Sequence, residues 1–265
     1  MRKSSFIKPS KILIVLSFVL MIAVNVLANL IPINGVTTGE VSDAYPNLIT
    51  PAAYTFSIWG LIYILLGFHT LYQLGLFRKE NCFFAENELL NSVGFYFSIS
   101  SIANAAWIMA WHYFKISLSV VIMIIILVCL IIINENTKKK KLNRKDKLFV
   151  RLPFSVYFGW ITAATITNVT VMLVSLNWKG FGVSDVTWAI IVLILGIIIG
   201  TTTVIRNKDI IYGLVFIWAY NGILVKHMSP NGYNFEYMSI IYTVMLCIVM
   251  LVAAEFFVLL KHGKK

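Results

Sequence analysis

Residues 116–133 read ISLSVVIMIIILVCLIII and are followed at 134–141 by NENTKKKK. Eighteen consecutive residues without a charge, closed by four lysines, are typical of a helix that crosses a bilayer, which takes about 20 apolar residues. Stretches of the same character lie at 12–31, 52–77, 89–113, 116–133, 152–176, 186–205, 210–225 and 237–260. The sequence therefore predicts an all-α fold, a polytopic transmembrane bundle of about eight helices.

The composition supports this fold class. Of the 265 residues, 59% are hydrophobic and only 12% are charged, about half the charged fraction of a soluble domain. These values exclude a water-soluble globule, a disordered chain and a disulfide-stapled secreted domain. The apolar runs are also too long for an outer-membrane barrel, whose alternating strands have roughly ten residues.

The cations predict the orientation of the bundle. With the N-terminus in the cytoplasm, 19 of the 22 lysines and arginines lie on the inner side, and only Lys115, Lys179 and Lys226 lie outside. Because cytoplasmic loops are enriched in Lys and Arg, we expect a multi-pass protein of the plasma (inner) membrane with both termini cytoplasmic. The lysine run at 138–141 lies between two spans, so we interpret it as a membrane-surface loop facing the lipid bilayer and expect no nucleic-acid partner.

The spans contain asparagine and tryptophan in place of charge. Trp160 and Asn168 share one face of their predicted helix, and Ser101, Asn104 and Trp107 follow a single stripe on another. Trp218 and Asn221 repeat the pairing near the C-terminus. Two interpretations are open. The asparagines form hydrogen bonds that link helices, or aromatic rings and amides line a cavity for a flat, mainly apolar molecule.

Three motifs occur in order along the chain: PAAYTFSIWGLIY at 51–63, ANAAW at 103–107 and WITAATITN at 160–168. They resemble the patterns P-x-x-W-x-F-x-x-W-x-x-x-Y, L-N-x-x-W and W-x-x-F-A-x-x-x-N of the tryptophan-rich sensory proteins. These proteins are the bacterial relatives of the mitochondrial translocator protein, the peripheral benzodiazepine receptor. Tyr54 stands where the family usually has Trp, and Ala163 stands where it has Phe.

The resemblance covers roughly residues 11–176. It implies a five-helix translocator-protein-like membrane core at 1–176, followed by a three-helix C-terminal membrane extension at 177–265. In the family, the bundle encloses a cavity that binds tetrapyrroles such as protoporphyrin and haem, and the first loop closes over it. By motif position, the resemblance implies stacking walls at Trp59, Tyr63, Trp107 and Trp160, and hydrogen-bonding partners at Ser101, Asn104 and Asn168.

The function that the resemblance implies is ligand binding in a sensory, regulatory or ligand-transport role, with a hydrophobic small molecule such as porphyrin or haem as the ligand. The alternative is a small-molecule transporter or permease without tetrapyrrole binding. No histidine or cysteine pair has metal-ligand spacing and no catalytic constellation is present in the sequence. We therefore expect no enzyme activity, no metal site and no required cofactor, while a homodimer stays open.

Overall fold

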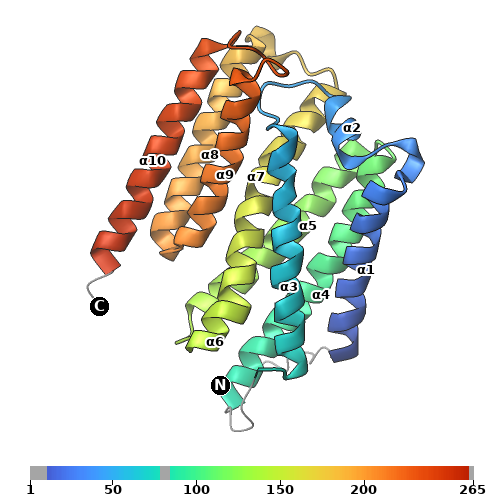
Figure 1. The fold of residues 1–265 in the computed structure, drawn as a ribbon, viewed down its shortest axis with the longest axis vertical. Coiled ribbons are helices and arrows are strands. Elements are labelled where there is room, and N and C mark those ends of the chain that lie inside the picture. Colours follow the sequence, from blue (N-terminus) through green and yellow to red (C-terminus); the bar gives the residue numbers. More distant parts are fainter. Residues whose placement is uncertain (1–10, 78–83, 263–265) are drawn as a thin grey trace. The chain divides into compact units, whose positions relative to one another are not determined.

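The computed structural model describes residues 11–77 and 84–262 (Figure 1). Within these ranges the chain is helical, and eight helices are long and apolar enough to cross a membrane. They lie at Lys11–Leu30, Ala53–Leu74, Glu88–His112, Ile116–Lys138, Arg144–Ser175, Asp185–Asn207, Ile210–Met228 and Met238–Lys261. The predicted fold class, an all-α polytopic helical bundle, is confirmed.

Local sequence explains where several of the helices begin and end. Helix α5 (Ile116–Lys138) continues past the apolar run into polar residues, and the hydroxyl of Thr137 donates to the carbonyl of Ile133 at 3.0 Å. Helix α8 (Asp185–Asn207) begins after Ser184, whose side chain accepts from the backbone N–H of Thr187. A serine in this capping position satisfies a backbone donor that would otherwise have no helical partner.

The chain forms two compact units. Unit 1 comprises Met1–Thr38 and Trp59–Phe158, and unit 2 comprises Gly39–Ile58 and Gly159–Lys265. The divisions fall after the first residue of α2 (Thr38–Asp43), after the first residue of α3 (Ile58–Leu74) and within helix α7 (Leu152–Ser175). The predicted boundary after residue 176 rests on the extent of the motif resemblance and stays a prediction.

Unit 1 is built around helices α1 (Lys11–Leu30), α3 (Ile58–Leu74), α4 (Phe84–His112) and α5, with the short helix α6 (Arg144–Asp146) and a π-helical turn before α7. Helix α4 packs against α1 and α5 (Figure 1). Near α6, the hydroxyl of Tyr72 donates to Asp146 at 2.8 Å, and both residues are buried.

Unit 2 contains α8, α9 (Ile210–Met228) and α10 (Met238–His262), together with most of α2 (Thr38–Asp43) and the turn η2 (Ala53–Ser57). Helix α10 packs against α8 and α9 (Figure 1). Helices α8 and α9 approach closely at Gly196, where an added Cβ would lie 2.5 Å from the hydroxyl of Tyr220. That hydroxyl donates to the carbonyl of Leu193 at 2.7 Å, so a polar bond also joins the two helices.

Candidate ligand-binding residues

Asn104 lies on α4 and links three helical segments of unit 1. Its side-chain oxygen accepts from the Nδ2 of Asn25 at 2.7 Å, and its own Nδ2 donates to the hydroxyl of Tyr157 at 3.2 Å. Asn104 and Tyr157 are fully buried and Asn25 is nearly so. The amide therefore joins α1, α4 and the start of α7, as expected of an asparagine that forms hydrogen bonds between membrane helices.

Two of the predicted aromatic residues lie beside this polar group. The ring of Trp59 stacks on Tyr63 with centroids 5.5 Å apart, and it meets Tyr157 edge-on at 6.1 Å. Tyr157 thus has a hydrogen-bonded hydroxyl and an aromatic neighbour on its ring. We refer to Asn25, Trp59, Tyr63, Asn104 and Tyr157 as the Tyr157 cluster.

Ser101 differs from Asn104, although it lies one turn earlier on the same helix. Its side chain is fully buried and its hydroxyl has no hydrogen-bond partner. A buried polar group without a partner costs on the order of 1–3 kcal/mol. Ser101 therefore offers a donor and an acceptor that the protein itself does not use.

Trp107, the next predicted residue on α4, stacks on Trp111 with centroids 5.5 Å apart. The indole of Trp111 in turn donates to the carbonyl of Thr38 at 3.1 Å. The neighbouring residue His112 forms a second bond to the same loop: its backbone carbonyl accepts from the side chain of Asn34 at 3.0 Å. These contacts anchor the beginning of the first loop to the end of α4.

The last two predicted residues, Trp160 and Asn168, lie in the part of α7 that belongs to unit 2. Both are buried, and the ring of Trp160 meets Phe56 edge-on at 5.9 Å. The seven predicted residues are thus divided between the units, and the proposal that they line one cavity stays a prediction.

Sequence reasoning missed two members of the Tyr157 cluster. Asn25 lies in the first apolar stretch, where an asparagine is itself an unusual residue and could have been noticed. Tyr157 lies one turn before Trp160 and carries no motif of its own. What joins the two to Asn104 is hydrogen bonding across 79 and 53 positions of the chain, which no local pattern reports.

The second pairing of tryptophan and asparagine, on α9, binds a segment of the same chain. The hydroxyl of Tyr54 donates to the side-chain oxygen of Asn221 at 2.7 Å, and its ring meets Trp218 edge-on at 5.3 Å. The indole of Trp218 donates to the carbonyl of Thr55 at 2.9 Å. In unit 2, therefore, the pair holds the turn η2 at the start of a membrane span.

Gly222 permits this contact. Its carbonyl accepts from the backbone N–H of Ala52 at 2.9 Å. A Cβ at position 222 would overlap the hydroxyl oxygen of Thr55 and would lie 2.9 Å from the Cβ of Pro51. Residues 51–55, which we call the anchor segment, can approach α9 this closely only because position 222 has no side chain.

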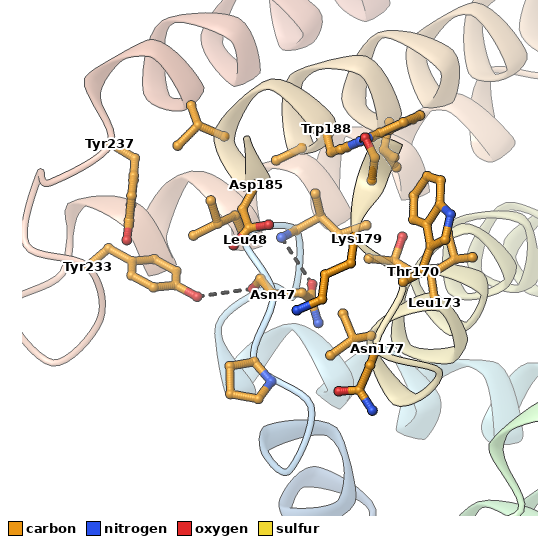
Figure 2. Close-up of a pocket in the computed structure, with 18 residues that line it drawn as sticks. Asn47, Leu48, Thr170, Leu173, Asn177, Lys179, Asp185, Trp188, Tyr233 and Tyr237 are labelled. Atoms are coloured by element: carbon orange, nitrogen blue, oxygen red, sulfur yellow. Dashed lines mark hydrogen bonds between the residues drawn. The ribbon is translucent and has the colours of Figure 1, made fainter. Parts of the chain in front are cut away.

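Unit 2 also contains a pocket of about 700 Å³ (Figure 2). It is lined by the end of α7, the start of α8, the first loop at 46–49 and the loop between α9 and α10. The aromatic and charged side chains in its lining are Trp178, Trp188, Tyr233, Tyr237, Lys179 and Asp185. The volume lies within the range of about 300–1,000 Å³ that is usual for small-molecule sites.

The aromatic walls of this pocket are held in place by the protein. Trp178 and Trp188 lie 4.8 Å apart, and the Trp188 indole donates to the carbonyl of Gly180 at 2.8 Å. On another side, Tyr233 lies 5.2 Å from Tyr237 and donates its hydroxyl to the carbonyl of Asn47 at 3.0 Å (Figure 2). These intramolecular contacts fix the positions of the aromatic walls.

The apolar helices and the intramembrane cluster of amides and aromatic rings define an integral, polytopic helical membrane protein. The family model described as TSPO-like protein matches residues 11–257, and the chain belongs to this family. This confirms the resemblance drawn from the three motifs. The match also runs past residue 176 through α8 and α9 and most of α10. No curated protein and no solved structure matches the chain.

Proposed function

We propose that the protein binds a flat, mainly apolar molecule of the porphyrin class among its membrane-spanning helices, in a sensory, regulatory or ligand-transport role. Membership of the TSPO-like family supports the proposal. The observation that carries it is the buried, unpartnered hydroxyl of Ser101, one turn from Asn104, whose amide donates to Tyr157 beside the ring of Trp59.

The chemistry of these residues suits such a ligand. Rings such as those of Trp59 and Tyr63 present large apolar faces, which pack well against a flat macrocycle. Ser101 provides a hydrogen bond for a polar edge, such as a pyrrole nitrogen or a carboxylic acid. We also assign Trp107, Trp160 and Asn168 to the porphyrin site, because they occupy the matching positions of the family motifs.

A fluorescence titration tests the proposal. Protoporphyrin IX is added to the purified protein and quenching of tryptophan emission is followed for the wild type, Ser101→Ala and Ser100→Ala. Ser100 is the matched control, because it is equally buried but its hydroxyl already donates to the carbonyl of Phe97 at 2.9 Å. Loss of one hydrogen bond of about 1 kcal/mol weakens binding about fivefold in Ser101→Ala, while the control keeps the wild-type affinity.

Absence of saturable quenching in the wild type would overturn the proposal. Equal affinities of Ser101→Ala and Ser100→Ala would remove Ser101 from the site. The porphyrin recovered after incubation should be unchanged, since the proposed function is binding without turnover. Counterflow of labelled porphyrin in liposomes then separates the roles: saturable counterflow indicates transport, and binding without counterflow indicates a sensory or regulatory role.

We also propose that both termini are cytoplasmic and that the protein resides in the plasma (inner) membrane. The support is the uneven distribution of lysine and arginine among the connecting segments. Impermeant thiol labelling of intact cells tests the orientation, with single cysteines introduced at Lys115 and Lys265. Label is expected at position 115 and not at 265, and the reverse pattern would invert the topology.

A further inference from the structure

We propose that the pocket of unit 2 binds the headgroup of a zwitterionic phospholipid from the surrounding bilayer, with the phosphate at Lys179 and the amine at Asp185. This site is separate from the proposed porphyrin site, because none of the predicted site residues lines the pocket. Lipid binding in this pocket can therefore be tested independently of porphyrin binding.

The pocket lies where the membrane spans end. Helix α7 ends at Ser175 and α8 begins at Asp185, and the lining residues Trp178 and Lys179 belong to the connection between them. Phe181 in the same connection is 87% exposed, as an aromatic side chain that enters the interfacial layer would be. Tryptophan and tyrosine are enriched at the membrane–water interface, which is the level of the lipid headgroups.

The two charges of the pocket point to a ligand that carries both signs. Lys179 and Asp185 are exposed, and neither forms an ion pair in the part of the chain that the structure describes. A purely anionic ligand would be attracted by Lys179 and repelled by Asp185. A simple cation would be attracted by Asp185 and repelled by Lys179. A phosphate and an amine in one headgroup satisfy both side chains.

The rest of the lining fits the same molecule. Tyr237 and Trp188 present aromatic rings, which attract an ammonium group through cation–π interactions. Asn47 and Asn177 supply amide donors for phosphate or ester oxygens. Leu173 provides apolar surface on which the glycerol and the first carbons of an acyl chain can pack.

The connection that carries Lys179 is preorganised for binding. Asn177, Gly180, Phe181 and Gly182 all have left-handed backbone conformations, with φ between 52° and 81°. Such conformations cost free energy for residues other than glycine and occur often at ligand clamps. A Cβ at position 180 would collide with the indole nitrogen of Trp188, so the glycine keeps this wall in place.

Native mass spectrometry of the full chain with phosphatidylethanolamine and phosphatidylglycerol of identical acyl chains tests the proposal. The wild type is expected to retain phosphatidylethanolamine in preference to phosphatidylglycerol. Lys179→Gln should weaken retention of both lipids about fivefold, the upper value for an exposed ion pair. Asp185→Asn should weaken phosphatidylethanolamine and strengthen phosphatidylglycerol, because it removes the partner of the amine and the repulsion of the anion.

Lys115→Gln is the matched control, since Lys115 is an exposed charge in a connecting segment and does not line the pocket. It should behave as the wild type. The proposal is overturned if the wild type retains both lipids equally, or if the pocket variants match the control. It is also overturned if free phosphoethanolamine at equal concentration displaces the lipid, because a soluble zwitterion would then be the occupant.

Discussion

Asparagines on the membrane spans have different partners in the two units. In unit 1, Asn104 is fully buried and bonds to side chains of two other helical segments. In unit 2, Asn221 is exposed on α9 and bonds to Tyr54 of the turn η2. The presence of an asparagine in a span does not by itself determine which part of the chain it binds. What differs is that the partners of Asn104 come from two other long helices, whereas the partner of Asn221 comes from the short turn that begins a membrane span.

The largest expected effect comes from filling the space at position 222. Gly222→Ala should lower the free energy of unfolding by about 3 kcal/mol, because the new Cβ overlaps Thr55 and forces the anchor segment away from α9. Thermal unfolding in detergent and limited proteolysis of the first loop measure the change. Gly39→Ala is the control, since nothing lies within 4 Å of its added Cβ. A stable, protease-resistant Gly222→Ala protein would contradict the proposed anchoring.

Removing the amide of unit 1 should have the next largest effect. Asn104→Ala leaves Tyr157 without its donor and Asn25 without one acceptor, which costs about 2 kcal/mol. The melting temperature in detergent checks this. Asn29→Ala, at an exposed position that bonds only within its own helix, should change little. Equal melting temperatures for the two variants would show that the buried amide contributes no stability.

The amide of unit 2 should contribute less, because it is exposed and forms one neutral hydrogen bond. Asn221→Ala and Tyr54→Phe should each cost about 1 kcal/mol. If both effects come from the hydrogen bond between the two side chains, the double variant should lower the free energy of unfolding no more than the larger single change does. Simple addition of the two effects would mean that the hydrogen bond is not the source of either.

The smallest effect concerns Tyr233 at alkaline pH. Burial, followed by the charges of Tyr237, Asp43 and Glu236, raises the pKa of Tyr233. The neutral phenol therefore stabilises the fold below a pH of about 10, and this contribution is lost as the pH rises through the folded-state pKa. Melting temperatures should fall more steeply above this pH in the wild type than in Tyr233→Phe. Parallel curves would contradict the shift.

The membrane spans could be predicted because hydropathy is a local property. The run at 116–133 has no charge, and α5 begins at its first residue. The end of α5 at Lys138 could not be predicted from hydropathy. Polar residues after Ile133 continue the helix, and the hydroxyl of Thr137 donates back to the carbonyl of Ile133. The stretch at 210–225, the shortest predicted span, extends to Met228.

The partners of the site residues could not be predicted in the same way. The sequence singled out Asn104 and Trp59, but their contacts with Asn25 and Tyr157 depend on which helices pack together and in what rotation. The pocket of unit 2 was missed for a related reason. Its lining comes from four segments that are individually ordinary in sequence, and the left-handed backbone residues that shape two of them, at 177–182 and at 234–235, are not marked by any motif.

The contact at Gly222 has a consequence for the evolution of the family. A position without room for a Cβ cannot accept another residue until the segment facing it has changed. Substitutions at 222 and at Thr55 should therefore occur together in related proteins, with a larger residue at one compensated by a smaller one at the other. Two positions that are far apart in the sequence would then show correlated substitutions.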